Sequence, residues 1–473
     1  MNSTEVMTLS GRTIRLPAAE IEKLAAGISG QVLCAGEEGY DSARAIWNAM
    51  IDKRPALIVR CAATSDVVRT VNFARENSLL LAIRGGGHNI AGNALCDGGI
   101  VLDLSQMRAA SVNPAARLVT IESGATLADL DAATQVYGLA TPVGINSTTG
   151  IAGLTLGGGF GWLSRKYGLT IDNLESAEVV TASGEVVRAS ATEHPDLFWA
   201  LRGGGGNFGV VTRFTFRLHP VGPNVLSGLI VYPLSEAKSV LQQYRAFAAK
   251  APDELAVWTV LRQAPPLPFL PAEAHGTAII ALALLYTGDP AQGEPLIEPL
   301  RHFGHPIGEH VGVQPYAAWQ QAFDPLLTAG ARNYWKSHNF STLQDGLFDT
   351  IIAAIEKQPS PQCEIFIGAL GGAASCPSPD SAAYASRDAR FVMNVHGRWD
   401  DPAEDARCIG WARDFFSASA PFAIGSVYVN FLTADEGQRV PAAYGLNYPR
   451  LAQVKRMYDP DNLFRVNQNI QPA

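Results

Sequence analysis

The stretch LLAIRGGGHN, residues 80–89, predicts a strand that runs into a glycine-rich turn. Consecutive glycines allow the backbone to turn its amide N–H groups inward and to approach a pyrophosphate closely. This turn therefore favours a site for a phosphate-bearing ligand directly after a strand.

The sequence on both sides of this turn alternates strand and helix patterns. The patterns lie at residues 20–50 (helix), 55–61 (strand), 65–78 (helix), 98–105 (strand), 117–126 (strand) and 125–138 (helix). The first 220 residues therefore predict parallel βαβ-like units mixed with antiparallel strands.

Two further glycine clusters follow, GGGFG at residues 157–161 and GGGGNFG at 203–209. A single cluster is more often a tight turn than a ligand loop, but three clusters at expected strand boundaries favour a ligand site. Gly204, Gly206 and Gly209 match a dinucleotide-binding fingerprint, which needs a strand before it and a helix after it. Here a helix pattern precedes and a strand pattern follows, so we reject that interpretation.

The pattern changes after residue 220. Strand patterns with interspersed helices predict an α+β region without glycine phosphate loops. The expected strands lie at residues 227–234, 254–262, 277–286, 363–372, 390–399 and 426–433. The tail returns to a helix over 441–462 and ends in LFRVNQNI at 463–470, where an apolar strand start leads into residues 467–469, which could form a simple C-terminal loop.

Composition excludes several classes of protein. The chain has 473 residues, of which 47% are hydrophobic and 17% charged, so it is not a disordered protein. The net charge of −8 and the absence of a basic run argue against nucleic acid and anionic membranes as partners. The N-terminal sequence has no secretory signal pattern, and no apolar run is long enough to span a membrane. Six scattered cysteines without a CxxC pair predict neither a metal site nor a disulfide scaffold, so we expect a cytoplasmic protein.

Four blocks together resemble a known family. Residues 84–107, 153–174, 196–212 and 448–470 are similar to the signature blocks of the berberine-bridge-enzyme-like flavoproteins, in the vanillyl-alcohol-oxidase / p-cresol-methylhydroxylase superfamily. The resemblance implies an α+β, two-domain FAD-binding fold. Residues 1–220, completed by 435–473, would form the FAD-binding domain, and 221–434 would form a substrate domain around an antiparallel sheet.

The resemblance also implies FAD as the cofactor. His88 matches the histidine that is bonded to the flavin 8α-methyl carbon in relatives. The implied cofactor-binding residues are Arg84, Gly85, Gly86, Gly87, His88, Asn89, Asn146, Gly150, Gly153, Leu154, Gly157, Gly158, Gly159, Gly161, Gly206, Gly209, Val210, Tyr428, Asn430 and Asn467.

The sequence departs from the family pattern at two places. Many relatives have a second flavin link through a cysteine, but the matching position here is Asn146, so one covalent link is expected. Relatives also place a tyrosine base at the position of Phe431, which has no ionisable group and accepts no proton. The oxidised C–H bond therefore needs either another proton acceptor or no strong base, as for a neutral amine.

Strand alternation gives further candidates for the catalytic residues. Asn394 and His396 share one face of their strand, Glu364 shares a face with Gln362 and Phe366, and Tyr428 shares a face with Asn430. We take Asn394, Tyr428, Glu364 and His396 as catalytic candidates; these polar faces could also be solvated or locally satisfied. A third polar face contains Tyr334, Lys336 and His338, and Trp258, Tyr286, Trp335, Phe366 and Phe431 are expected to line an apolar cleft.

The resemblance implies an FAD-linked oxidoreductase. It would oxidise a C–H bond next to oxygen or nitrogen of a small molecule by hydride transfer to flavin N5, with O2 as the electron acceptor. Two alternatives remain open from the sequence. One is a flavin-binding protein without simple oxidase turnover, since fold does not guarantee activity. The other is an oxidative cyclase or a monooxygenase-type flavoenzyme.

Overall fold

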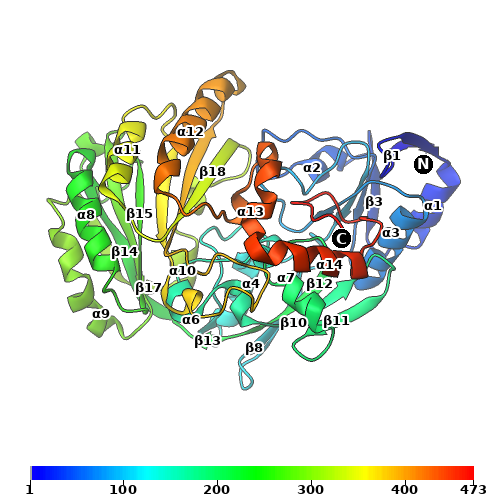
Figure 1. The fold of residues 1–473 in the computed structure, drawn as a ribbon, viewed down its shortest axis with the longest axis horizontal. Coiled ribbons are helices and arrows are strands. Elements are labelled where there is room, and N and C mark those ends of the chain that lie inside the picture. Colours follow the sequence, from blue (N-terminus) through cyan, green and yellow to red (C-terminus); the bar gives the residue numbers. More distant parts are fainter. Residues whose placement is uncertain (1–2) are drawn as a thin grey trace.

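The computed structural model describes residues 3–473, which fold around three main β-sheets. In Figure 1 the largest sheet lies at one end of the long axis, and the N-terminal strands and helices lie at the other end. The C-terminal helices, α13 (Val440–Tyr444) and α14 (Tyr448–Tyr458), lie between these ends.

The first sheet contains the strand that precedes the first glycine turn. Its order is β3-β4-β6-β5, with β4 paired parallel to β6 and β5 paired parallel to β6. The strands are β3 (Gln31–Cys34), β4 (Leu57–Arg60), β5 (Leu81–Arg84) and β6 (Ile100–Asp103). Helix α3 (Thr64–Glu76) connects β4 to β5 and contacts β6, which confirms the predicted βαβ-like unit.

The second sheet contains five strands that pair only in the antiparallel sense. Its order is β11 (Val186–Ser190), β10 (Leu174–Val180), β12 (Val210–Arg217), β8 (Leu118–Glu122) and β7 (Ala110–Asn113). Helix α7 (Pro195–Leu201) precedes the third glycine cluster and β12 follows it. This helix-to-strand order confirms that the cluster is not a dinucleotide-binding fingerprint.

The third sheet has seven antiparallel strands and confirms the expected α+β class. Its order is β17 (Gly308–Pro315), β14 (Asn224–Pro233), β16 (Ala278–Tyr286), β15 (Leu255–Gln263), β19 (Glu364–Ala369), β20 (Phe391–Trp399) and β18 (Arg332–Phe340). Helices α8 (Ala237–Ala248), α11 (Asp345–Ile355) and α12 (Asp405–Ser419) cover its outer face (Figure 1). The opposite, inner face of this sheet therefore faces the rest of the molecule.

Shorter elements complete the fold. The paired strands are β1 (Thr4–Met7) with β2 (Thr13–Leu16), and β9 (Leu139–Ala140) with β13 (His219–Pro220). The remaining helices are α1 (Ala18–Ala26), α2 (Tyr40–Arg44), α4 (Leu127–Gln135), α5 (Ile151–Leu156), α6 (Ser164–Tyr167), α9 (Pro290–Ile297) and α10 (Tyr316–Gln320).

Three expectations about local structure are wrong. Residues 20–50 are not one helix, because α1 ends before β3 and α2 is only one turn long. The segment 426–433 is not a strand but contains a 3-10 turn at Val429–Phe431. Residues 426–433 do not form a strand because two of their side chains hydrogen bond elsewhere. The Tyr428 hydroxyl accepts from the Gly159 amide, and Asn430 donates to the carbonyl of Gly153. The tail helix is split at Gly445, whose φ of +51° ends α13.

Within residues 3–473, no helix combines the length and the apolar sequence that crossing a bilayer would require. The same residues contain no group of three or more histidine, cysteine or acidic side chains arranged to hold a metal ion.

Candidate functional site

A cavity of about 320 Å³ separates the glycine-rich segments from the inner face of the seven-stranded sheet. We call one side the glycine wall, which is formed by residues 83–94, 144–156, 205–211 and 464–468 that line the cavity. We call the other side the strand wall, which is formed by Trp258, Trp335, Glu364, Phe366, Asn394 and His396. The turn with Tyr428, Asn430 and Phe431 closes the space between the two walls.

The first glycine turn presents its backbone to the cavity. Strand β5 ends at Arg84, and residues 85–89 line the cavity directly after it. Among the described residues, no hydrogen bond joins the amide N–H groups of residues 86–89 to a protein acceptor. Gly87 has a φ of +71°, which helps to turn successive N–H groups to one side. Such a nest of free donors suits an anionic group such as a pyrophosphate.

Gly86 is required by a close approach between two backbones. A Cβ atom at Gly86 would lie 2.4 Å from the amide nitrogen of Gly150, and a Cβ at Gly150 would lie 2.4 Å from that of Gly86. Both residues line the cavity. The two glycine segments can therefore touch only because neither has a side chain at this point.

Five residues expected to bind the cofactor do not line the cavity: Arg84, Gly157, Gly158, Gly159 and Gly161. The Arg84 side chain turns away and donates a hydrogen bond to the carbonyl of Ala43. The four glycines follow helix α5 rather than a strand, and they leave room for neighbours. A Cβ at Gly157 would collide with the Asn430 side chain, and one at Gly158 would collide with Tyr384. Their position supports the cavity wall from behind.

The third glycine cluster meets the C-terminal tail. Gly206, Gly209 and Val210 line the cavity, and Asn467 Nδ2 donates to the carbonyl of Gly206 at 3.1 Å. Asn467 Oδ1 is buried and has no hydrogen-bond partner among the described residues. The tail therefore offers one unused acceptor, Asn467 Oδ1, to a ligand in the cavity.

His88 is held by a chain of hydrogen bonds that fixes its tautomer. The Thr148 hydroxyl donates to Asn146 Oδ1 at 2.7 Å, and its oxygen lies 3.0 Å from His88 Nε2. Because the Thr148 proton is already used, Nε2 is the donor and Nδ1 keeps a lone pair. Burial lowers the pKa of His88 to about 4, so the ring is neutral at pH 7. Trp47 stacks on the imidazole with a centroid distance of 5.1 Å.

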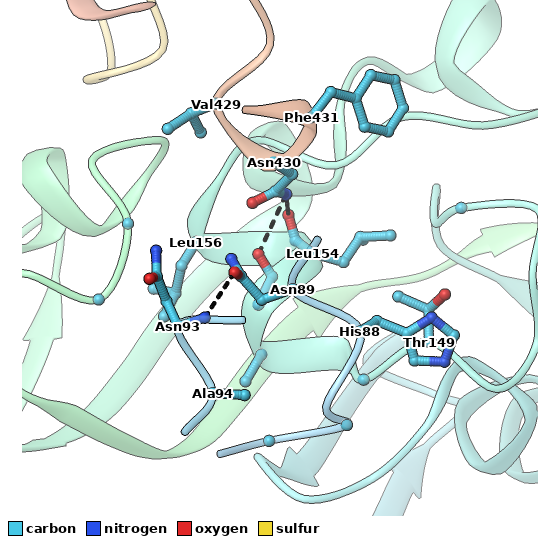
Figure 2. Close-up of a pocket in the computed structure, with 18 of the residues that line it drawn as sticks. His88, Asn89, Asn93, Ala94, Thr149, Leu154, Leu156, Val429, Asn430 and Phe431 are labelled. Carbon is cyan, nitrogen blue, oxygen red and sulfur yellow. Dashed lines mark hydrogen bonds between the residues drawn. The ribbon is translucent and has the colours of Figure 1, made fainter. Parts of the chain in front are cut away.

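The turn that replaces the expected strand brings three side chains to the cavity. Figure 2 shows Asn430 between Val429 and Phe431, with its amide directed at the end of helix α5. Asn430 Nδ2 donates to the carbonyls of Gly153 and Leu154 at 3.2 and 3.3 Å. These bonds anchor the turn to the glycine wall, so Phe431 and Tyr428 reach the cavity from the same segment.

The Tyr428 hydroxyl is a neutral hydrogen-bonding group. Its oxygen accepts bonds from the Gly159 amide at 3.1 Å and from Asn430 Nδ2 at 2.9 Å. Burial nevertheless raises the pKa of Tyr428 to about 12. The phenol therefore keeps its proton at neutral pH and acts as a donor rather than as a base.

The catalytic candidates of the strand wall lie in neighbouring rows of the sheet. Glu364 is directly opposite His396, and Phe366 is directly opposite Asn394. All four line the cavity. Because side chains alternate along a strand, this register puts two cross-strand pairs on the inner face, one polar and one of an aromatic ring with an amide, two residues apart.

Glu364 is a buried carboxylate with compensating partners. Arg262 Nη1 lies 2.6 Å from Glu364 Oε2, and His396 Nδ1 lies 3.4 Å from Oε1. Burial raises the pKa of Glu364, but the Arg262 guanidinium outweighs this effect, and the pKa is lowered to about 2. The carboxylate is therefore ionised and paired at neutral pH.

His396 has one nitrogen that can accept a proton. Its Nε2 donates to Asn333 Oδ1 at 2.9 Å, because Asn333 Nδ2 is already a donor to the carbonyl of Ala331. Burial lowers the pKa of His396, so the ring is neutral and Nδ1 holds a lone pair beside Glu364. A carboxylate next to this nitrogen would stabilise the imidazolium that forms on proton uptake.

The expected aromatic lining is present except for one residue. Trp258, Trp335, Phe366 and Phe431 line the cavity, whereas Tyr286 packs against Gly293 elsewhere. The polar face with Tyr334, Lys336 and His338 points to the other side of its strand, where Lys336 pairs with Asp435 and Glu436.

Sequence reasoning missed Trp47 and Thr148. Trp47 follows α2 and reaches the cavity because its indole N–H donates to the carbonyl of Leu327 at 2.8 Å, in the segment between β17 and β18. Neither residue lies in a motif, and only the spacing of Thr148 two residues after Asn146 could have indicated it.

Comparisons with known proteins agree with this architecture. A family model described as an FAD binding domain matches residues 55–190, and one described as berberine and berberine like matches 427–471. An FAD-linked oxidoreductase of Dictyostelium discoideum is 33% identical over 457 residues, which cover 96% of this chain and 97% of the relative. The (R)-6-hydroxynicotine oxidase of Paenarthrobacter nicotinovorans is 30% identical and covers 94% of this chain and 97% of the relative.

Solved structures share the fold. The crystal structure of 6-hydroxy-D-nicotine oxidase from Arthrobacter nicotinovorans superposes with a TM-score of 0.85 at 29% identity, covering 94% of this chain and 98% of that chain. A berberine-bridge-enzyme-like protein of Physcomitrella patens has a TM-score of 0.85 at 23% identity. The fold and the relatives define an FAD-linked oxidoreductase. The chain belongs to the berberine-bridge-enzyme-like branch of the vanillyl-alcohol-oxidase / p-cresol-methylhydroxylase family.

The residues of the cavity fit FAD as the cofactor. The free N–H groups of residues 86–89 suit the pyrophosphate, and the unused Asn467 Oδ1 suits a donor of the cofactor. The close contact of Gly86 with Gly150 provides a surface without side chains on which the cofactor can lie.

Proposed function

We propose that this protein oxidises a C–H bond next to nitrogen or oxygen in a neutral small molecule, with FAD bonded to His88. The observation that carries the proposal is the glycine wall, where the four free amide groups of residues 86–89 include that of His88, whose side-chain Nδ1 has an unused lone pair. When bound along the glycine wall, FAD would supply the redox chemistry: its N5 would accept the hydride, and O2 would take up the electrons to give hydrogen peroxide.

The protein's own residues bind and orient the substrate. The aromatic side chains of the strand wall exclude water from the cavity, and the paired Glu364 leaves no unpaired charge there. Nδ1 of His396 is the site that takes up a proton when the substrate needs a base. Phe431 lines the cavity without any proton acceptor, so a neutral amine is a suitable substrate.

We further propose that residues 1–220 with 435–473 hold FAD and that 221–434 hold the substrate. The packing supports this division. One apolar core contains mainly residues between 221 and 428, and two others contain mainly residues before 220 and after 427. The names of the relatives support oxidation of small molecules, among them a hydroxynicotine and chitooligosaccharides.

Acid precipitation of the purified protein tests the covalent bond. We expect a yellow pellet that stays yellow after washing, and a protein mass increased by one FAD. His88→Ala should release all flavin on precipitation because the nucleophile is lost. A colourless wild-type pellet, or covalent flavin in His88→Ala, would contradict the assignment.

Thr148 provides a sharper test of the bond because it sets the tautomer of His88. Thr148→Val should slow flavin attachment about tenfold, since Nε2 loses its acceptor and Nδ1 is no longer kept free. Thr148→Ser restores the hydroxyl and should restore the rate. The rate is measured by adding FAD to apoprotein and following acid-stable absorbance.

Anaerobic mixing with amines, alcohols, sugars and phenols tests the reaction class. Bleaching of the flavin, followed by peroxide release when O2 is admitted, is the expected result for at least one neutral compound. A product that has gained oxygen would indicate monooxygenation instead, and a flavin that no compound bleaches would indicate a protein without oxidase turnover.

A further inference from the structure

The side-chain amide of Asn394 stands unused in the middle of the strand wall. Asn394 is 1% exposed and lines the cavity, and neither its Nδ2 nor its Oδ1 has a hydrogen-bond partner among the described residues. Ser337, directly opposite on β18, also has a buried hydroxyl without a partner. The protein therefore leaves a donor and an adjacent acceptor unsatisfied on the cavity side of the sheet.

The unpaired amide of Asn394 indicates that a ligand binds at this position. Burying a donor and an acceptor without partners is destabilising, and an apolar residue would fill the same place without that penalty. The amide becomes satisfied when a bound molecule offers an acceptor and a donor side by side. A lactam or a carboxamide has this arrangement and can form two hydrogen bonds with Asn394 at once.

The surroundings of Asn394 select a flat, mostly apolar molecule. Phe366 is its cross-strand neighbour, and this ring stacks on Trp258 with a centroid distance of 5.9 Å and an interplanar angle of 8°. Phe431 meets the rings of Phe366 and Trp335 edge-on, at 6.2 and 5.5 Å. Few polar atoms remain here to satisfy the many hydroxyl groups of a sugar.

The charges nearby select a neutral molecule. Glu364 and His396 are the ionisable side chains of the strand wall. The Glu364 carboxylate is paired with Arg262 on one oxygen and faces His396 on the other. A cationic substrate would find no unpaired carboxylate here, and an anionic substrate would find no free guanidinium.

We infer that the cavity takes a neutral, planar molecule whose lactam or carboxamide edge pairs with the amide of Asn394. This inference rests on the proposed function, because it identifies the class of molecule that the oxidase would hold. Asn394 acts as a specificity residue, and it acts without giving or taking a proton.

The inference can be tested with two bicyclic probes of the same shape. 2-Quinolone carries the lactam N–H, and coumarin replaces that N–H with a ring oxygen. Calorimetric titration of the purified holoenzyme should show that 2-quinolone binds at least about tenfold more tightly, because coumarin leaves Asn394 Oδ1 unpaired. Equal affinities, or tighter binding of coumarin or glucose, would overturn the inference.

The variant Asn394→Leu makes the test specific. It should reduce the affinity for 2-quinolone to that for coumarin while the melting temperature stays the same or rises, since no internal hydrogen bond is lost. Met393→Leu changes the neighbouring residue, on the opposite face of β20, and should keep the preference for 2-quinolone. A preference that persists in Asn394→Leu would overturn the inference.

Two readouts separate this inference from the proposed function. The absorbance spectrum of the ligand-free Asn394→Leu enzyme should match that of the wild type; a shifted flavin spectrum would assign the amide to the cofactor and overturn the inference. Calorimetry does not depend on the flavin bond, so a wild-type pellet that loses its colour in acid would refute attachment to His88 while the probe preference still decides the role of Asn394.

Discussion

The two walls of the cavity are built in opposite ways. The glycine wall presents backbone, and its shape depends on the absence of side chains, as at Gly86 and Gly150. The strand wall presents side chains, and its shape depends on the register that aligns Glu364 with His396 and Phe366 with Asn394. A cofactor common to a family can be held by backbone geometry, whereas a particular substrate must be selected by side chains. We therefore expect the glycine wall to hold the cofactor and the strand wall to select the substrate.

The largest effect is expected at Gly86, where the glycine wall has no space for a side chain. Gly86→Ala should prevent retention of FAD and lower stability by several kcal/mol, because its Cβ would lie 2.4 Å from the backbone of Gly150. Gly85→Ala is the matched control, since its Cβ would make ordinary contacts of 3.4 Å with the Ser123 carbonyl oxygen and 3.5 Å with the Ala152 Cβ. Flavin content per protein and thermal unfolding measure both effects.

If Gly85→Ala lost FAD as completely as Gly86→Ala, the close approach of Gly86 to Gly150 would not explain why the turn requires glycine. The free amide groups would then be the reason. The contrast between a wall made of backbone and a wall made of side chains would then need a different physical basis.

The next effect concerns the ion pair behind the strand wall. Glu364→Gln should lower the free energy of unfolding by about 3 kcal/mol, because it leaves the buried Arg262 guanidinium without its anion. The folded-state pKa of Glu364, about 2, lies below its ordinary value of 4.5, so the carboxylate contributes stability above about pH 4.5 and loses it as the pH falls toward 2. Chemical denaturation at pH 7 measures the loss.

The exposed pair of Arg245 with Asp345 is the control for this change. Asp345→Asn should change stability much less than Glu364→Gln does, because solvent screens the exposed pair. An equal loss in both variants would mean that the strand wall does not depend on its buried charges.

The contrast between the walls also explains how much the sequence could predict. Part of the glycine wall could be predicted because a turn that needs several glycines appears in the sequence as a short motif. Residues 85–89 of this motif do line the cavity. The alternation of β20 correctly put Asn394 and His396 on one face, since the period of a strand is fixed. The role of each of these residues in binding or catalysis stays a prediction.

What the sequence could not predict depends on contacts between distant segments. Trp47 reaches His88 only because its indole hydrogen bonds to Leu327, in the distant segment that leads into β18. The segment with Tyr428 and Asn430 has the composition of a strand, yet side-chain hydrogen bonds to the glycine segment replace strand pairing. Arg84 precedes the turn but does not line the cavity, because side chains alternate along the strand and Ile83 takes the cavity side.

The smallest effect is expected at the joint between the segments that carry the two walls. Asp131 on α4 is buried, and its Oδ2 accepts a hydrogen bond from Gln320 Nε2 on α10 at 3.2 Å. Asp131 Oδ1 and Gln320 Oε1 are both buried acceptors without a donor among the described residues. Burial raises the pKa of Asp131 to about 7, so the carboxyl group is mostly protonated at pH 5 and ionised at pH 8.

The pH dependence follows from this shift. Between pH 3.8 and 7 the folded state binds more protons at Asp131 than the unfolded state, so the contribution of this group to stability falls as the pH rises. Asp131→Asn cannot ionise and supplies a donor in place of the lost proton. It should therefore raise stability by about 1 kcal/mol at pH 8 and change it little at pH 5. Melting temperatures at the two pH values measure the difference, and the same gain at both would show that ionisation of Asp131 does not weaken the joint.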